Sequence, residues 1–238
     1  IDWLSAKEYQ SNPEKVSELS QYDGILVPGG FGETGIEGKI NAIRFARENK
    51  IPYFGLCYGM QLMTVEYARN VAGLGGANST EFDPDTPHPV IALITEWQGR
   101  DGKVERRDAN SDLGGTMRLG AFAAALKEGS HISKIYGATE ISERHRHRYE
   151  FNGAYRSRFE AEGFVCSGTS PDRRLVEFIE LRNHPFWVGT QAHPEFKSRP
   201  DRPHPLFREL IGASLAYRST SGRSMAPQSA EVDHSVVS

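Results

Sequence analysis

The residue best suited to nucleophilic chemistry is Cys57, in the stretch GLCYGMQ at 55–61. It lies between Gly55 and Gly59, and this Gly-x-Cys-x-Gly spacing matches the strand–nucleophile–helix elbow, in which small residues relieve the crowding of a sharp turn. The start of the following helix would lower the pKa of the thiol and favour the thiolate. Most free cysteines are small core residues, however, so the motif alone leaves a nucleophile and a buried thiol equally open. Cys166 has no comparable setting and is predicted to be a core residue.

A thiolate nucleophile needs a base, and the base needs a group that orients it. The segment FWVGTQAHPEF at 186–196 runs from an apolar stretch into His193 and Glu195. In an extended backbone residues i and i+2 point the same way, so Glu195 is expected beside His193, where a carboxylate can fix the imidazole tautomer. A plain surface turn is the alternative, since His-Pro also occurs at 88, 184 and 204. Only the copy at 193 has a carboxylate two residues later.

The glycine-rich segment PGGFGETG at 28–35 matches the dinucleotide-binding pattern Gly-x-Gly-x-x-Gly, beginning at Gly30, between a strand and a helix. That pattern also needs an acidic residue about 20 positions later to hold the ribose, and the segment 51–59 has none. The remaining interpretations are a tight turn and a loop whose backbone N–H groups face a developing negative charge. If the two strands are parallel neighbours, this loop and Cys57 meet at one sheet edge, which favours the second interpretation.

The early part of the chain alternates between predicted strands and helices. Apolar runs at 24–28 and 51–56 indicate buried strands, and helical spacing follows at 36–50 and from about 59. This order is typical of parallel βαβ units in a sheet that is covered on both faces. The predicted fold class is therefore α/β, a three-layer sandwich with a mostly parallel sheet flanked by helices.

Later segments predict further elements of the same domain. Strands are expected at 89–94, 114–120, 164–168, 174–181 and 186–191, with a charged loop at 96–112 and a last helix at about 204–218. We expect one domain over residues 1–218 and a disordered tail at 219–238, which is rich in serine and small residues. Residues Ile1–Leu4 look like part of a strand, and the lack of an initiator methionine suggests a fragment of a longer chain.

Composition excludes several classes of function. The 238 residues carry a formal net charge of −3, which gives no electrostatic case for binding nucleic acid or a membrane surface. No apolar run approaches the ~18 residues of a membrane span, and the chain opens with no signal peptide. Two cysteines do not make a disulfide framework and suggest a reducing compartment. A cytoplasmic protein is expected.

The basic run RHRHR at 144–148 has several possible roles. It could be a solvated basic strand, a His-x-His metal pair or a nucleic-acid patch. In an extended chain Arg144, Arg146 and Arg148 share one face and the two histidines share the other, so one face can turn toward a carboxylate while the other packs. No third ligand lies nearby at a suitable spacing, so we predict no metal site.

With the elbow, the glycine loop and His-x-Glu in place, the chain resembles the class I glutamine amidotransferases, whose glutaminase domains use a Cys-His-Glu triad. From about residue 20 to 217 it is similar to the C-terminal glutaminase domains of the CTP synthase family. The motifs that carry this likeness are LVPGGFG at 26–32, GLCYGMQ at 55–61, ANSTEFDPD at 77–85, SDLGGTMRLG at 111–120, ERHRHRYEFN at 143–152, GTSPD at 168–172 and AHPEFKSRP at 192–200.

The resemblance implies a role for each matching residue. Cys57 would be the nucleophile, His193 the general acid and base, and Glu195 its partner. The backbone N–H groups of Gly30 and Tyr58 would form the oxyanion hole. The substrate L-glutamine would be held by Gly30, Tyr58, Gln61, Glu81 and Arg148. Tyr58 stands where the family has leucine, which puts little in doubt because its backbone N–H would do the work.

The resemblance also implies partners. The glutaminase domain itself would need no cofactor or metal. A preceding synthetase domain of the same parent chain, together with the first strand of this domain, would be missing here. That domain would bind ATP, UTP and Mg, with GTP as an allosteric activator for which Arg107 is a speculative contact, and the parent enzyme would be a homo-oligomer. The alternatives are the glutaminase domain of another amidotransferase, or a peptidase-like or chaperone-like cysteine protein of the same architecture.

Overall fold

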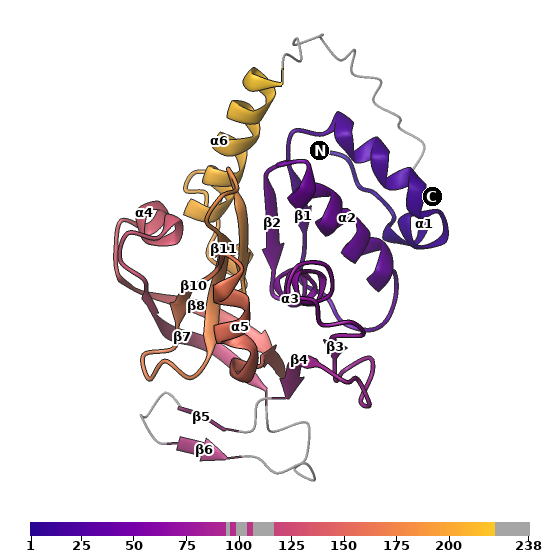
Figure 1. The fold of residues 1–238 in the computed structure, drawn as a ribbon. Coiled ribbons are helices and arrows are strands. Elements are labelled where there is room, and N and C mark those ends of the chain that lie inside the picture. The colour runs from indigo at the N-terminus through magenta and orange to yellow at the C-terminus, as the bar shows by residue number, and fades with distance from the viewer. Residues whose placement is uncertain (94–95, 99–103, 107–116, 222–238) are drawn as a thin grey trace, which may run out of the picture.

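Strands drawn from the whole length of the chain form one seven-stranded sheet (Figure 1). The computed structural model describes residues 1–93, 96–98, 104–106 and 117–221. In sheet order the strands are β1 (Ile25–Val27), β2 (Tyr53–Leu56), β12 (Trp187–Thr190), β11 (Val176–Leu181), β10 (Phe164–Thr169), β7 (Arg118–Leu126) and β8 (Glu140–His147).

The predicted α/β sandwich is confirmed, and its sheet is mixed. Strand β2 pairs in parallel with both β1 and β12, whereas the pairs from β12 through β11, β10 and β7 to β8 are antiparallel. The prediction of a mostly parallel sheet therefore holds only for the edge formed by β1, β2 and β12. The physical reason is connection length: residues 182–186 between β11 and β12 are too few for the crossover that parallel strands need.

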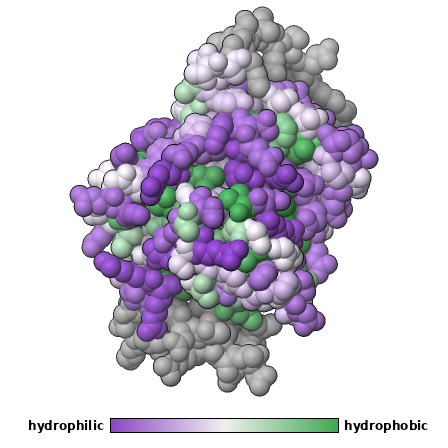
Figure 2. All heavy atoms as spheres, viewed as in Figure 1, coloured by the Kyte–Doolittle hydropathy of each residue, from purple (hydrophilic) through white to green (hydrophobic). Residues whose placement is uncertain are grey.

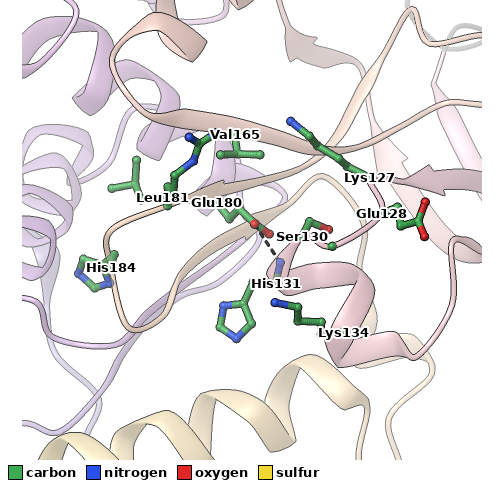
Figure 3. A pocket seen from close by; sticks show the side chains of 11 residues that line it. Lys127, Glu128, Ser130, His131, Lys134, Val165, Glu180, Leu181 and His184 are labelled. Carbon is green, nitrogen blue, oxygen red and sulfur yellow. Dashed lines mark hydrogen bonds between the residues drawn. The ribbon is translucent and has the colours of Figure 1, made fainter.

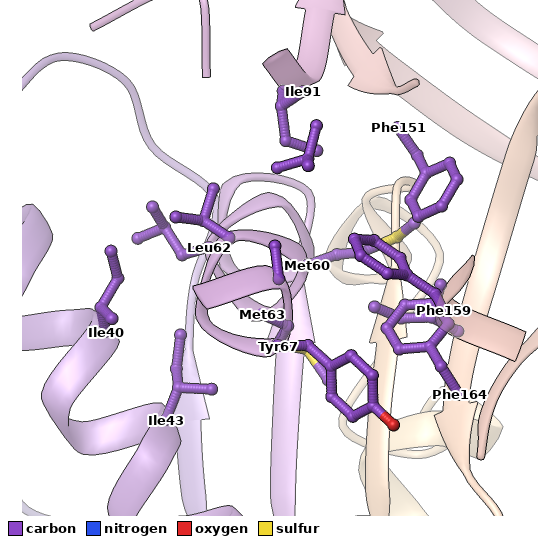
Figure 4. Close-up of a cluster of buried hydrophobic side chains, with 14 of the residues drawn as sticks. Ile40, Ile43, Met60, Leu62, Met63, Tyr67, Ile91, Phe151, Phe159 and Phe164 are labelled. Carbon is purple, nitrogen blue, oxygen red and sulfur yellow. The ribbon is translucent and has the colours of Figure 1, made fainter. Parts of the chain in front are cut away.

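Helices cover both faces of the sheet. One face packs against α2 (Ile36–Glu48), α3 (Tyr58–Asn70) and α5 (Arg156–Ala161), and the other against α4 (His131–Tyr136) and α6 (Pro205–Thr220). Helix α3 is buried on all sides from Tyr58 to Ala68, and Figure 4 shows Met60, Met63 and Tyr67 among the surrounding apolar side chains. Because the helix is packed on every side, the position of its first residue is fixed.

Smaller elements complete the fold. Strands β3 (Asn78–Ser79), β4 (Pro89–Leu93) and β9 (Tyr149–Phe151) form a second sheet. Strands β5 (Glu96–Gln98) and β6 (Val104–Arg106) pair antiparallel, so the segment 96–112 is not simply the predicted loop. The 3-10 helices are η1 (Pro13–Gln21), η2 (Gly153–Tyr155) and η3 (Pro194–Phe196).

Three boundaries differ from those expected. Ile1–Leu4 belong to no strand, and the chain instead begins with α1 (Ala6–Ser11); Ile1, Trp3 and Leu4 are exposed, so they lack the burial that a sheet strand would give them. The strand predicted at 114–120 is described only from residue 117, and β7 runs on to Leu126. Helix α6 extends to Thr220, two residues into the predicted tail, most of which lies outside the described residues.

Polar residues predominate on the face shown in Figure 2, and apolar residues appear there as separated patches. In the described part of the chain, no helix combines the length and the apolar character that crossing a membrane requires.

Candidate active site

Cys57 occupies a strained turn between β2 and α3. Its backbone has φ 45° and ψ −96°, a conformation that side-chain-bearing residues rarely adopt, and it is the N-cap residue of α3. Its N–H donates to the carbonyl oxygen of Thr190 at the end of β12, at 2.6 Å. Such strain persists only where the surrounding structure over-determines it, and it gathers at functional sites. This is the geometry of a nucleophile elbow.

The two glycines of the motif are required by the close approach of neighbouring backbone. A β-carbon on Gly59 would lie 2.3 Å from the carbonyl oxygen of Val27 in β1. One on Gly55 would lie 2.7 Å from the carbonyl carbon of Gly59 and 2.6 Å from Sδ of Met63. The Gly-x-Cys-x-Gly spacing thus lets β1, β2 and α3 meet at the turn.

His193 and Glu195 form a hydrogen-bonded pair directly after β12. Nδ1 of His193 lies 2.6 Å from Oε1 of Glu195, so the predicted pairing is present. The expected extended backbone is wrong, because η3 (Pro194–Phe196) begins directly after His193 and the contact is made across this 3-10 turn. The imidazole stacks on Phe196 with ring centroids 5.2 Å apart, and the backbone N–H of His193 donates to the carbonyl of Arg144 at 2.8 Å. Nε2 is buried and has no hydrogen-bond partner among the described residues. The pair can therefore present Nε2 as a proton acceptor.

Gly29 links the glycine loop to both reactive side chains. A β-carbon on Gly29 would lie 2.9 Å from Cε1 of His193 and 3.8 Å from Cβ of Cys57. The loop, the cysteine and the histidine therefore meet at one sheet edge, as parallel pairing of β1 with β2 predicted. Within the loop, a β-carbon on Gly30 would lie 3.7 Å from the Tyr58 ring.

Burial, rather than the helix terminus, dominates the electrostatics of the thiol. Desolvation raises the pKa of Cys57 to about 12, and the negative charge of Glu195 adds to the increase. Hydrogen bonds from the N–H of Tyr58 and the side chain of Gln191 act in the opposite direction but are outweighed. The predicted lowering of this pKa is therefore wrong. The balance of these effects favours the neutral thiol over the thiolate.

Of the side chains expected to hold the substrate, Tyr58 and Glu81 lie beside the glycine loop, whereas Gln61 lies against Tyr149 and Gln191. Burial raises the pKa of Glu81, against the lowering effects of the Gly32 N–H and the positive charge of Arg148, so these three groups are close together. The hydroxyl of Tyr58 donates to the carbonyl of Gly32 at 2.6 Å. Gln61 is buried, and its Nε2 donates to the carbonyl of Tyr149 at 2.9 Å. The speculative GTP contact Arg107 lies outside the described residues.

The basic run 144–148 alternates as predicted. His145 and His147 are buried, whereas Arg144 and Arg146 are exposed along β8. No group of three or more potential metal ligands occurs among the side chains that the structure describes. The histidine face packs, and Arg144 and Arg146 are solvated. Arg148 departs from the predicted face, because it lies beyond the end of β8, is half-buried and acts on Glu81.

Sequence reasoning missed a buried charged cluster behind these histidines. Arg118 contacts Glu150 through Nη1 at 3.1 Å and Glu177 through Nη2 at 2.5 Å. Nδ1 of His145 lies 3.0 Å from Nε2 of His147, and burial holds the pKa of both imidazoles well below the usual range. The members come from β7, β8, β9 and β11, so no local pattern could have brought them together.

Gln191 was also missed, although a signal for it exists. It directly follows the buried strand β12 (Trp187–Thr190), so it lies at the end of the strand that leads to His193. Its Nε2 donates to Sγ of Cys57 at 3.5 Å, and its backbone N–H donates to the carbonyl of Glu177 at 2.9 Å.

A pocket of about 390 Å³ lies at the other end of strands β10 and β11 and beside α4 (Figure 3). Its lining includes Lys127, Val165, Leu181 and His184, and the antiparallel pairing of β11 with β12 places Leu181 away from the edge that carries Cys57. None of the predicted site residues lines it, so it takes no part in the chemistry considered below.

The profile of the family described as "Glutamine amidotransferase class-I" matches residues 4–213. The chain belongs to the class I glutamine amidotransferases. Among curated relatives it is 55% identical over 217 residues to CTP synthase of Desulfotalea psychrophila and 56% identical over 223 residues to that of Leifsonia xyli. These alignments cover 91% and 93% of this chain but 39% and 38% of the relatives, so the chain spans less than half of their length.

Solved structures agree with this assignment. The amidotransferase chain is 35% identical to the glutaminase domain of Trypanosoma brucei CTPS with bound acivicin, with a TM-score of 0.80. That alignment covers 91% of this chain and 80% of the other. A putative GMP synthase component from Thermoplasma acidophilum shares the fold at 16% identity and a TM-score of 0.52, over 87% of this chain and 79% of the other. This amidotransferase domain is thus of the CTP synthase type, which removes the peptidase-like and chaperone-like alternatives.

Proposed function

We propose that this domain hydrolyses the side-chain amide of L-glutamine through Cys57, His193 and Glu195, and that the ammonia serves the ATP-dependent amination of UTP to CTP. The observation that carries the proposal is the strained turn at Cys57 beside a histidine whose Nδ1 is held by a carboxylate and whose Nε2 has no partner among the described residues. A neutral thiol and a nearby acceptor nitrogen are what nucleophilic catalysis by cysteine needs.

In the first half of the reaction, Cys57 forms a bond to the substrate. Nε2 of His193 takes the thiol proton, and Glu195 stabilises the imidazolium through Nδ1. The sulfur attacks the amide carbon of glutamine, and the N–H groups of Gly30 and Tyr58 hold the oxyanion. His193 then returns the proton to the nitrogen as the C–N bond breaks, which releases ammonia and leaves a γ-glutamyl thioester on Cys57.

In the second half, water replaces the sulfur. His193 takes a proton from water as the oxygen adds to the thioester carbonyl, and the same N–H groups hold the second oxyanion. The C–S bond breaks, glutamate leaves and the proton returns to the sulfur. One histidine thus acts as base and acid in each half.

Recognition of the amino acid rests on opposite charges. The carboxylate of Glu81 can pair with the substrate ammonium, and Arg148 close by can meet the carboxylate through charge-assisted hydrogen bonds. The NH₂ group of Gln61 already donates a hydrogen bond to the carbonyl of Tyr149. The side-chain oxygen of Gln61 is therefore the atom left to accept a hydrogen bond from the substrate.

The fate of the ammonia is inferred from the relatives. Since the chain covers 39% of the length of CTP synthase from Desulfotalea psychrophila, the remaining length accommodates a synthetase domain that would bind ATP, UTP and Mg. Those ligands, activation by GTP, assembly into a homo-oligomer and a cytoplasmic location belong to the proposal for the parent protein. No cofactor is assigned to this domain.

The test is the covalent capture of Cys57 by acivicin, read by peptide mass spectrometry, alongside release of glutamate from glutamine with and without a synthetase domain, nucleotides and GTP. We expect one adduct on Cys57 that is lost in Cys57→Ala. The matched control is Cys166→Ala, which removes the other buried free cysteine and should keep the adduct. An adduct that survives Cys57→Ala, or glutamine hydrolysis by that variant, overturns the proposal.

A further inference from the structure

The orientation of two buried amides next to Cys57 is fixed by a backbone carbonyl. The carbonyl oxygen of Tyr149 can only accept a hydrogen bond, so Gln61, 2.9 Å away, must turn its NH₂ group toward it. The same nitrogen lies 3.4 Å from the side-chain oxygen of Gln191. Gln191 therefore faces Gln61 with its oxygen and must turn its own NH₂ group the other way.

The NH₂ group of Gln191 then faces the nucleophile. Its Nε2 lies 3.5 Å from Sγ of Cys57, within hydrogen-bond range for sulfur. Gln61 and Gln191 are both buried, so neither amide exchanges its partners with bulk water. The backbone of Gln191 is held as well, because its N–H donates to the carbonyl of Glu177 at 2.9 Å. The donor that faces the sulfur is therefore anchored from both ends.

We propose that Gln191 is a catalytic hydrogen-bond donor to the sulfur of Cys57, and that Gln61 positions it through the Tyr149–Gln61–Gln191 relay. This role deepens the proposed glutaminase function and rests on Cys57 being the nucleophile. With the N–H of Tyr58 also directed at the sulfur, two donors stabilise the thiolate. The thiol hydrogen is then left to point away from both.

This arrangement addresses the main difficulty of the site. The thiol is buried, and burial disfavours its anion. The N–H of Tyr58 is also assigned to the oxyanion hole, so it must be shared between the sulfur and the substrate oxygen during the reaction. Gln191 has no role in the oxyanion hole, because its oxygen is engaged by Gln61 and its NH₂ group donates one hydrogen bond to the sulfur. It can stabilise the sulfur whenever the sulfur carries negative charge, before attack on the amide and when the C–S bond of the thioester breaks.

The test measures the rate at which iodoacetamide alkylates Cys57 between pH 6 and 9, with the site read by mass spectrometry. Gln191→Met keeps the length of the side chain and removes the donor. Removal of one hydrogen-bond donor to the thiolate raises the pKa of Cys57 by about one unit and lowers the thiolate fraction about tenfold. We therefore expect alkylation to be about tenfold slower throughout this range. For glutamine hydrolysis, kcat should fall by a similar factor while KM changes less than about twofold.

Two further variants separate this role from a structural one. Thr190→Val perturbs the same turn, because the Thr190 hydroxyl accepts from the N–H of Ala192 at 3.2 Å, but it removes no donor to the sulfur. Its alkylation rate should stay within about twofold of wild type. Gln61→Met releases the oxygen of Gln191 and should slow alkylation by a smaller factor than Gln191→Met.

A wild-type alkylation rate in folded Gln191→Met, or equal slowing in Thr190→Val, overturns the inference. If Gln191→Met does not fold, Gln61→Met decides in the same way, and an unchanged rate there contradicts the relay. Alkylation requires no glutamine, so its result is independent of the acivicin experiment. A slowed rate together with no acivicin adduct would support the donor while removing the proposed glutaminase function.

Discussion

Gly29 leaves the space that the imidazole of His193 occupies: a β-carbon there would lie 2.9 Å from Cε1 of that ring. The glycine loop therefore contributes to the site in two ways: Gly29 has no side chain, which leaves room for the imidazole, and the backbone N–H groups can donate hydrogen bonds. The ring is confined between this loop and the side chain of Phe196, on which it stacks. A small side chain at position 29 must displace the imidazole.

Gly29→Ala is accordingly expected to lower kcat for glutamine hydrolysis by about 10²-fold, since a displacement of about 1 Å can cost that much. The change touches a side chain rather than buried backbone, so the midpoint of urea unfolding should move little. Gly75→Ala is the matched control, because a β-carbon there meets no atom within 4 Å, and it should keep full activity. Full activity in Gly29→Ala would contradict the placement of His193.

The strain at Cys57 predicts an unusual order of stability among variants that lack the thiol. Glycine adopts φ 45°, ψ −96° more readily than alanine does. Cys57→Gly should therefore have a free energy of unfolding about 1 kcal/mol higher than that of Cys57→Ala, and neither variant should hydrolyse glutamine. Urea denaturation of the two proteins measures the difference, and a Cys57→Ala protein of equal or greater stability would show that the turn is not strained.

Arg118 is expected to dominate the stability of the buried charged cluster. Arg118→Met leaves the carboxylate of Glu177 buried without its cation and removes a hydrogen-bond donor to Glu150, which costs about 3–5 kcal/mol at neutral pH. The comparison is Arg44→Met, which removes an exposed ion pair with Glu48 at 2.9 Å and should cost less than about 1 kcal/mol. Similar losses in the two variants, measured by urea unfolding, would argue against the cluster.

Glu150 predicts a pH dependence of stability. Burial and the charge of Glu177 raise the pKa of Glu150 to about 8, against the effect of Arg118. The folded protein then keeps a proton that the unfolded chain releases near its ordinary pKa of about 4.3. The stability from this proton is fully present below that ordinary value and is lost as the pH rises through about 8.

Glu150→Gln should remove this contribution. Between pH 5 and pH 8.5 the free energy of unfolding of wild type should fall, relative to the variant, by more than about 1 kcal/mol. The lowered pKa values of His145 and His147 make the free energy of unfolding rise with pH below the ordinary imidazole pKa, which is the opposite trend. Wild type and Glu150→Gln both retain these imidazoles, so the comparison between them isolates Glu150. Parallel urea-unfolding profiles across this range would show that Glu150 does not titrate as described.

Much of the site could be predicted because it is encoded locally. Gly55, Cys57 and Gly59 specify a sharp turn by their spacing. The close spacing of His193 and Glu195 keeps them together, although across the 3-10 turn Pro194–Phe196 and not along an extended backbone. Buried apolar runs separated by helical patterns indicated the parallel pair β1 and β2, which brings the glycine loop to Cys57. Each of these inferences needs only neighbouring residues and the geometry of one strand or helix.

Other features depended on tertiary structure, because they arise from contacts between distant segments. The antiparallel pairing of β12 with β11 places Glu177 beside Gln191, and strands β7, β8 and β9 bring Arg118 to His147 and Glu150. The pKa of Cys57 was misjudged because the helix terminus is visible in the sequence, whereas the desolvation that outweighs it is not. The sequence alone determined which groups could react, whereas the packing decided their protonation and the donors that face them, since burial depends on the whole fold.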